Sequence, residues 1–391
     1  MPEEVVRGVD ALRAYLQRIA FRQLYKFIAG SNHYGVLPSV VNRTSAAGVE
    51  HFFATVLRGC PGLELAQCLL TGRPAERDQL SDADRATADL LAAAELLRAE
   101  DGRILPADLQ LINAFGSDLL VDRRIHFPAG SLHEVYVGFD SYLMLYYLDL
   151  AEVQREHRAV DLCTGSGIAA LHLAQRCDHV LATDIGPVPL RLVQINRRLN
   201  AKEGILTVRN QPLDETLDGS ERFDVLTCNP PFVAYPPGFG ATLYSQGTEV
   251  DGLGYMRTIL DRLPEVLTPG GCAYLVADLV GGLHGPHFVH ELRQRARADG
   301  LAIDVYIDGV VDAEDQVPAF TAHMAAANPQ RDRQELAAEL RRFQREELRA
   351  ERYYLSTLRV QTDRQPGLRL LRRYALPEGA KGETWPEILL S

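Results

Sequence analysis

Apolar residues recur along the chain at two different spacings. From Val5 to Ile28, and again after Ser81, they fall three or four positions apart, which predicts amphipathic helices. We expect the helix that follows Ser81 to run to about Gly102, with Ser81 as its N-cap. Apolar runs between residues 103 and 121 then predict short strands around a turn. The first part of the chain is therefore predicted to be mainly helical, with a small β element at its end.

Residues 1–125 are predicted to form a separate, smaller domain. A helix cluster that ends in a long helix and a small β-wing resembles the winged-helix arrangement. The long helix carries Asp82, Asp84, Asp89 and Glu95, whereas a helix that reads DNA would carry basic side chains. We therefore favour a lid or a substrate-recruiting role for this domain over nucleic-acid binding, with structural support as a further alternative.

From residue 126 to residue 391, strand-like runs alternate with helical patterns. Strands are expected at residues 159–162, 180–183, 206–208, 225–227, 273–277 and 303–307. This rhythm predicts an α/β fold with a doubly wound, mostly parallel, Rossmann-like sheet. A helical insertion is expected at about 312–352, and Tyr353–Val360 is expected to complete the sheet as an edge strand.

Composition narrows the classes of function. The chain has 391 residues, more than one core usually organises, and its 41 basic and 52 acidic residues give a net charge of −11. That charge disfavours a broad nucleic-acid surface. The first residues lack a basic and apolar leader and no apolar run has membrane-spanning length, so we expect a cytoplasmic protein. The six cysteines form no C-x-x-C pair and do not cluster with histidine, so we expect reduced thiols and no metal site.

Two motifs point to a nucleotide-like ligand. Gly165 and Gly167 lie between a predicted strand and a predicted helix, where glycine lets the backbone approach a ligand closely. Asp184, at the end of the next strand, is suited to accept hydrogen bonds from both ribose hydroxyls, although a turn-forming role before Gly186 is the structural alternative. The run from Gly165 to Ala170 also fits a dinucleotide-binding pattern, so these residues alone leave NAD and S-adenosylmethionine open.

A third motif, Asn229-Pro230-Pro231-Phe232, follows an apolar strand-like run. Two prolines cannot continue a strand, because each lacks the N–H group and has a fixed φ. The chain must therefore leave the sheet in a stiff loop at a strand's carboxyl end, where ligands bind in open α/β sheets. Such a loop would hold an amide and an aromatic face where they could grip a planar group that bears NH₂.

These motifs, in this order and spacing, resemble those of class I S-adenosylmethionine-dependent methyltransferases that methylate amines and amides. That group includes DNA adenine enzymes and peptide-release-factor glutamine enzymes. The resemblance covers residues 135–306 and implies S-adenosylmethionine as the cofactor. It implies that Asp161 orients the loop and the methionine ammonium, that Gly165 and Gly167 line the cofactor, and that Asp184 holds the ribose. Asn229 and the Pro230 carbonyl would accept hydrogen bonds from the substrate NH₂, and Phe232 would stack on the planar group.

The sequence departs from the family pattern at two positions. Cys163 stands where the family usually has its first glycine, and Pro212 stands where an acid commonly binds the adenine amine. Asn210 or Gln211 could replace that acid. The helix that opens near Asp140 carries several tyrosines, which either pack the helix on the sheet or face a bound cation.

The resulting hypothesis is an S-adenosylmethionine-dependent N-methyltransferase that acts on a planar nitrogen of a small molecule or a protein side chain. One alternative keeps the cofactor but cyclises its aminobutyrate arm and releases methylthioadenosine. A second is a non-catalytic nucleotide-binding module. The candidate catalytic residues are Asn229, Pro230, Phe232 and Tyr142, and the cofactor-binding candidates are Tyr136, Asp140, Ser141, Asp161, Cys163, Gly165, Gly167, Asp184, Asn210 and Asn229.

Overall fold

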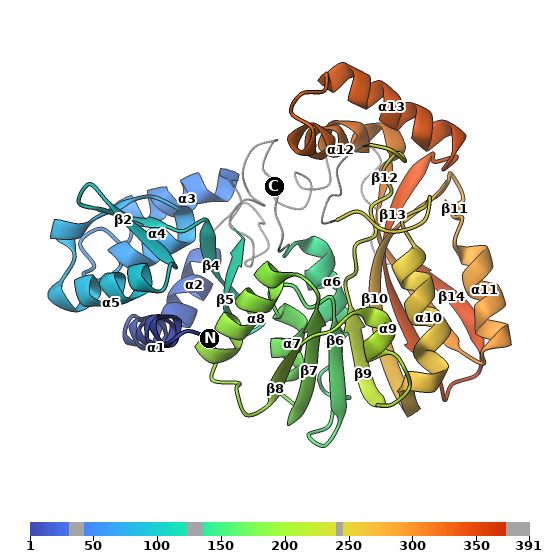
Figure 1. Ribbon diagram of the computed structural model, residues 1–391, viewed down its shortest axis with the longest axis horizontal. Coiled ribbons are helices and arrows are strands. Elements are labelled where there is room, and N and C mark those ends of the chain that lie inside the picture. The colour runs from blue at the N-terminus through green and yellow to red at the C-terminus, as the bar shows by residue number, and fades with distance from the viewer. Residues whose placement is uncertain (31–42, 123–134, 136, 240–244, 373–391) are drawn as a thin grey trace.

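The computed structural model describes residues 1–30, 43–122, 135, 137–239 and 245–372. An amino-terminal unit lies beside a large α/β unit (Figure 1). The helices of the first unit are α1 (Glu3–Arg18), α2 (Phe21–Gly30), α3 (Arg43–Thr55), α4 (Glu64–Thr71) and α5 (Asp82–Ala93). Its strands are β1 (Ala75–Glu76), β2 (Leu97–Glu100) and β3 (Arg103–Pro106), which pair in the order β1-β3-β2, and the separate hairpin β4 (Leu109–Ala114) and β5 (Ser117–Asp122).

The helix after Ser81 is shorter than the sequence pattern predicts. Its start agrees with the prediction, because the Ser81 hydroxyl accepts a hydrogen bond from the Asp84 backbone N–H at 3.2 Å. It ends at Ala93 instead of near Gly102, since Glu95 takes a left-handed conformation with a φ of 58°. Leu97 then enters strand β2, which pairs with β3. The pairing of β2 with β3, and not the local apolar spacing, therefore decides where this helix ends. The winged-helix resemblance of the whole unit stays a prediction.

A nine-stranded sheet forms the centre of the second unit within the described residues. Its strands are β6 (Arg158–Leu162), β7 (His179–Asp184), β8 (Leu206–Asn210), β9 (Phe223–Cys228), β10 (Leu267–Gly282), β11 (Gly285–Pro286), β12 (Ala302–Asp312), β13 (Arg352–Gln361) and β14 (Gly367–Arg372). The order is β14-β12-β13-β10-β9-β6-β7-β8, with β11 paired to β10 alone. From β8 to β10 all pairs are parallel, which agrees with the predicted mostly parallel sheet.

The expectation that Tyr353–Val360 forms an edge strand is wrong. These residues belong to β13, which lies between β10 and β12 and is antiparallel to both. The edge on this side is β14, which adds in parallel to β12. An apolar run cannot by itself tell an edge strand from an inserted strand, because both have strand character and only long-range pairing separates them.

Helices cover both faces of the sheet. The core on one face includes residues of α6 (Phe139–Tyr147), α7 (Ile168–Leu173) and α8 (Pro187–Leu199). The core on the other face includes residues of α10 (Gly254–Val266) and α11 (Val289–Ala298), beside the short helix α9 (Leu213–Thr216). Two more helices, α12 (Ala313–Ala327) and α13 (Arg333–Glu346), lie between β12 and β13 in the chain and pack together at one end of the molecule (Figure 1).

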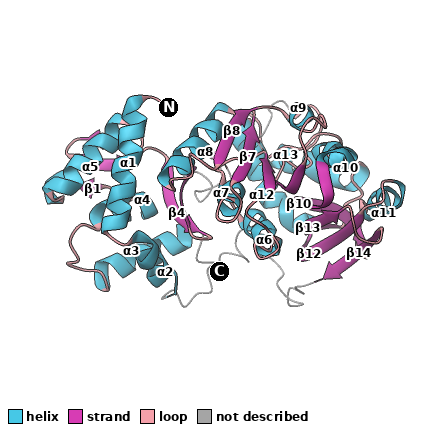
Figure 2. Cartoon of the chain, turned by 90° about the horizontal axis from the view of Figure 1, so that it is seen from below, coloured by secondary structure: helices cyan, strands magenta, loops and turns pink. Residues whose placement is uncertain are grey.

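The amino-terminal unit is joined to the sheet through helix α8, which both views place next to the β4–β5 hairpin (Figures 1 and 2). The Asn196 side chain accepts a hydrogen bond from Leu120 N at 2.8 Å and donates to Leu120 O at 2.9 Å. One turn later, Asn200 accepts from Asp118 N at 3.0 Å and donates to Asp118 O at 2.7 Å. Two side-chain amides thus form hydrogen bonds with the N–H and C=O groups of β5, as the backbone of a neighbouring strand would.

Candidate active site

Asp161 organises the loop that joins β6 to α7. It lies at the end of β6 and is 2% exposed. One carboxylate oxygen accepts from the Thr164 hydroxyl at 2.6 Å and from Ala170 N at 3.1 Å, and the other accepts from the Thr227 hydroxyl at 2.8 Å. Burial raises the pKa of Asp161 to about 6, although these three hydrogen bonds act in the opposite direction. Asp161 therefore ties together the glycine loop, the first turn of α7 and strand β9.

The glycine loop needs left-handed backbone at three positions. Cys163, Gly165 and Gly167 have φ values of 50°, 55° and 81°. A Cβ on Gly167 would lie 2.6 Å from Cγ2 of Val193, so this glycine lets α7 approach α8 closely. Among the described residues, a Cβ on Gly165 would meet no atom closer than 3.9 Å. Cys163 takes a conformation that glycine adopts more readily, which gives a physical reason for the glycine that the family usually has there.

Asp184 ends strand β7 beside this loop. One of its oxygens accepts from Gly165 N at 3.0 Å, and the other accepts from Ile185 N at 2.8 Å and from Gly186 N at 3.0 Å. The carboxylate is thereby fixed next to the glycine loop, and it also shapes the turn that the structural alternative foresaw. Asn210, at the end of the adjacent parallel strand β8, pairs with Asp184. The two predicted residues therefore lie together at the carboxyl ends of neighbouring strands, and Asn210 is exposed there.

The side-chain amide of Asn229 is held by the start of helix α6. Its Nδ2 donates to Asp140 Oδ2 at 3.0 Å and to Ser141 Oγ at 3.2 Å. Asp140 is itself oriented, because its Oδ1 accepts from Ser141 N at 2.8 Å. With both N–H bonds of the amide directed at α6, the carbonyl oxygen Oδ1 must point away from that helix. Asp140 and Ser141, predicted as cofactor-binding residues, contact Asn229 in this structure.

The residues around Asn229 form a compact loop at the end of β9. Cys228 and Pro230 are buried, and Phe232 is half-buried against the cores of both sheet faces. The pKa of the Cys228 thiol is raised well above its usual value, mainly by burial and to a lesser extent by the contact with Cys163. Both cysteines are free thiols, and a buried thiol with a raised pKa is a poor nucleophile.

A half-buried aspartate, Asp278, lies near Asp140 on strand β10. Oδ1 of Asp278 has no hydrogen-bond partner among the described residues. Burial, followed by the charge of Asp140, raises the pKa of Asp278 to about 7. The only sign of Asp278 in the sequence is a single acid inside the apolar run of residues 273–280.

The tyrosines of α6 point in different directions. Tyr142 is buried and stacks on Phe115 of the β4–β5 turn, with ring centroids 5.7 Å apart. Tyr147 stacks on Tyr306 of β12 at 4.1 Å and donates a hydrogen bond to Asp308. The Tyr147 contact matches packing on the sheet, whereas Tyr142 packs on the amino-terminal hairpin instead. The catalytic role of Tyr142 stays a prediction. Tyr136, the remaining predicted residue, lies outside the described residues.

Two observations fit S-adenosylmethionine at this edge of the sheet. The hydroxyl oxygen of Ser166 is buried in the glycine loop and has no hydrogen-bond partner among the described residues. The backbone of Gly165 has space beside it among the described residues, as a closely approaching ligand requires. Residues that could hold the cofactor are therefore Gly165, Ser166 and Asp184, with Asn210 beside them.

Some residues that build the site were missed by the sequence analysis. Thr164 and Thr227 are the hydroxyl donors to Asp161, and the signal for Thr227 is a hydroxyl residue at the end of an otherwise apolar strand. Gly252 is another: a Cβ there would lie 2.3 Å from the Phe232 carbonyl oxygen, so its segment packs directly on the Asn229 loop. Its signal is the turn-forming pair Asp251-Gly252.

Part of the chain is similar to known methyltransferases. Residues 135–243 match the family model of the methyltransferase small domain. A release factor glutamine methyltransferase from Clostridium acetobutylicum is 29% identical over 136 residues, which are 32% of this chain and 47% of that protein. A ribosomal protein uL3 glutamine methyltransferase from Bordetella pertussis is 32% identical over 167 residues, 40% of this chain and 53% of that protein. The chain thus spans about half the length of the curated relatives it matches.

Among solved structures, a methyltransferase from Agrobacterium tumefaciens aligns with a TM-score of 0.41 and 13% identity, over 68% of this chain and 76% of that chain. No helix in the described part of the chain is long and apolar enough to cross a membrane. Residues 135–243 thus match the methyltransferase small domain, and the sequence relatives reported above are glutamine methyltransferases.

Proposed function

We propose that the protein is an S-adenosylmethionine-dependent N-methyltransferase whose acceptor is a planar nitrogen of an amide, amine or heterocycle. The observation that carries the proposal is the orientation of Asn229. Because Asp140 and Ser141 take up its N–H groups, its Oδ1 is the atom that remains to accept a hydrogen bond from an acceptor NH₂.

In this proposal, the chain works by positioning the nucleophile. Bound S-adenosylmethionine supplies an electrophilic methyl group on its sulfonium. Asn229 Oδ1 and the Pro230 carbonyl accept the two N–H bonds of the acceptor, and the half-buried ring of Phe232 supports its plane. The nitrogen held in this way would attack that methyl group, and a nitrogen–carbon bond would replace the methyl carbon–sulfur bond, leaving S-adenosylhomocysteine. A proton leaves the nitrogen once positive charge has developed there, so no strong base is required.

The first acceptor class to test is a side-chain amide of a protein. The relatives described above are named as glutamine methyltransferases of release factors and of ribosomal protein uL3. A glutamine amide is planar and carries an NH₂ group, as the Asn229 loop requires. Such acceptors would place the reaction in the cytoplasm. Nucleic acids are not among the proposed acceptors, because a net charge of −11 repels their phosphate backbone.

The test of this proposal is the Asn229→Ala variant. We expect it to lose turnover, since the acceptor would no longer be held in line, while its affinity for S-adenosylmethionine, measured by calorimetry, stays within about tenfold of the wild type. Full activity in Asn229→Ala would refute the assignment of this residue. Failure of the wild-type protein to bind S-adenosylmethionine would refute the proposed function as a whole.

A further inference from the structure

The Asn229 loop packs against a second segment of backbone, which comprises residues 245–253. Val233 N donates to Ser245 O at 2.9 Å, and Gly247 N donates to Val233 O at 3.0 Å. A Cβ on Gly252 would lie 2.3 Å from the Phe232 carbonyl oxygen and 3.0 Å from Ala234 N. The contact at Gly252 is backbone against backbone, so a shift of the 245–253 segment cannot be absorbed by a flexible side chain.

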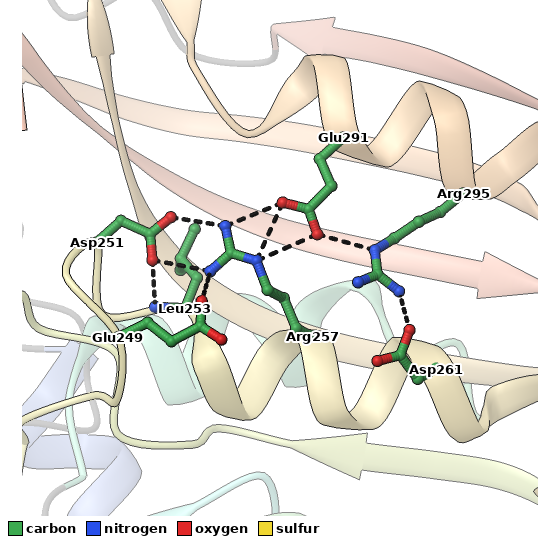
Figure 3. A network of polar contacts seen from close by, with 7 residues as sticks. All are labelled: Glu249, Asp251, Leu253, Arg257, Asp261, Glu291 and Arg295. Carbon is green, nitrogen blue, oxygen red and sulfur yellow. Dashed lines mark hydrogen bonds and ion pairs between the residues drawn. The ribbon is translucent and has the colours of Figure 1, made fainter.

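Arg257 of helix α10 contacts two acidic side chains of this segment, Glu249 and Asp251 (Figure 3). Its Nη1 and Nη2 donate to the two oxygens of Asp251 at 2.9 and 2.8 Å, and Nη1 also contacts Glu249. Its Nε donates to both oxygens of Glu291 on α11, at 3.1 and 3.0 Å. A planar guanidinium can make these contacts together, because its five donors lie in a fixed fork. Arg257 therefore connects the segment to α10 and α11, two helices that pack on one face of the sheet.

The fork holds the acidic part of the segment, Glu249 and Asp251, whereas packing holds its end, because Leu253 is buried in the core on one face of the sheet. A cavity of about 420 Å³ is lined by Glu249, Asp251 and Arg257, together with apolar side chains that include Val280 and Phe288. Glu249 and Asp251 thus border open space, and the fork is what holds this part of the segment. The Arg257 guanidinium lies 5.1 Å from the Phe288 ring centroid, which steadies the arginine but not the segment.

We infer that Arg257 is a positioning residue for the proposed reaction, because it fixes the 245–253 segment and, through Gly252, the backbone of Phe232 and Ala234. The inference rests on the proposed function only where turnover is concerned. The structural part, that Arg257 rigidifies the loop around Phe232, stands without it. Arg257 does not touch the acceptor or the cofactor in this account.

Arg295 provides a matched control within the same network (Figure 3). It contacts Glu291 at 2.9 Å and Asp261, and both of these partners belong to helices. Arg257→Lys and Arg295→Lys each keep a positive charge and lose a guanidinium fork, but only the first loosens the 245–253 segment. We expect Arg257→Lys to lower kcat about 10- to 100-fold, the equivalent of one or two lost charge-assisted hydrogen bonds, with unchanged affinity for S-adenosylmethionine. Arg295→Lys should keep kcat within about threefold of the wild type.

A second readout does not need the reaction. Hydrogen exchange of the peptide that covers Phe232 to Ala234 should be at least about tenfold faster in Arg257→Lys than in the wild type, and unchanged in Arg295→Lys. Asp251→Asn should behave as Arg257→Lys does, and the double variant should be no worse than either single variant. Equal exchange and equal loss of melting temperature in the two arginine variants would overturn the inference and leave a merely structural network. If exchange follows the prediction but no methyl transfer occurs in the wild type, the proposed function fails and the positioning contact stands.

Discussion

At the scale of single residues, the Asn229 amide is defined by the groups that occupy its donors. An isolated asparagine could present either its NH₂ or its carbonyl to a ligand. Asp140 and Ser141 remove that choice, since a carboxylate and a hydroxyl at 3.0 and 3.2 Å take the two N–H bonds. The helix start that the sequence placed beside the cofactor therefore acts on the acceptor side of the proposed reaction.

We predict that Asp140→Ala lowers kcat about 10- to 100-fold, because the amide then loses a charge-assisted hydrogen bond and rotates more freely. Asp140→Asn is the matched control, as its carbonyl oxygen can still accept from Asn229 and its turnover should fall less. Steady-state kinetics with saturating cofactor separates the two variants. Wild-type turnover in Asp140→Ala would show that the amide needs no such support.

Much of the site could be predicted at this scale. Gly165, Gly167, Asp184 and the Asn229 loop follow strand patterns directly, so their places at strand ends are local properties of the sequence. The contacts of Asn229 with α6 could not be predicted in this way. They join residues 88 and 89 positions apart, and no spacing rule connects such positions.

At the scale of elements, the glycine loop is where two helices and two strands meet. Gly167 begins α7 in a left-handed conformation, and its missing side chain lets α8 approach. Asp184 lies at the end of the neighbouring strand β7, and its carboxylate accepts a hydrogen bond from Gly165 N. A change in the packing of α7 on α8 would therefore move the backbone that is proposed to line the cofactor.

Gly167→Ala should destabilise the protein by roughly 1–3 kcal/mol, since the added Cβ meets Val193 and the φ of 81° is strained for alanine. Affinity for S-adenosylmethionine should fall with it. Gly204→Ala is a suitable control, because no atom of the described part of the chain lies within 4 Å of a Cβ at that position. Thermal unfolding and calorimetry measure the two effects, and equal behaviour of both variants would contradict the packing argument.

The order of the sheet shows where element prediction from the sequence fails. The parallel strands from β6 to β9 follow the alternating pattern, because each is joined to the next through a local crossover. Strand β13 instead enters between β10 and β12 after two additional helices. Its antiparallel pairing depends on backbone groups 40 or more residues away, and an apolar run does not encode that choice.

At the scale of the whole molecule, buried charge links the stability of the fold to pH. Asp278 lies in β10 at the centre of the sheet, and burial, followed by the charge of Asp140, raises its pKa to about 7 from an unfolded value of 3.8. The folded state then holds a proton that the unfolded state has already released. Stability from this group is therefore greatest below about pH 4 and falls as the pH rises to about 7.

The Asp278→Asn variant should lose this pH dependence, since asparagine does not ionise. Its melting temperature relative to the wild type should be higher at pH 8 than at pH 5 by several degrees. Thermal unfolding at the two pH values measures the difference. The same relative melting temperature at both values would mean that Asp278 is not perturbed in the folded protein.

The amino-terminal unit belongs to this scale as well. Asn196 and Asn200 bond the β5 backbone, and Asn196 also donates to Ser166 O at 2.8 Å in the glycine loop. The unit predicted as a lid or recruiting domain thus meets the proposed cofactor loop through a buried side chain. Nothing in the sequence marks this contact, because two asparagines four positions apart on a helix are ordinary surface residues in most proteins.

The central claim is that the Asn229 loop presents an external nitrogen to the methyl group of S-adenosylmethionine. Mass analysis of a reaction with methyl-labelled cofactor and glutamine-containing peptides or protein fractions tests it most directly. We predict S-adenosylhomocysteine as the by-product and one labelled methyl group on a nitrogen of the acceptor, with both signals lost in Asn229→Ala. Methylthioadenosine as the by-product, with no labelled acceptor, would contradict the account and indicate cyclisation of the cofactor's own aminobutyrate arm.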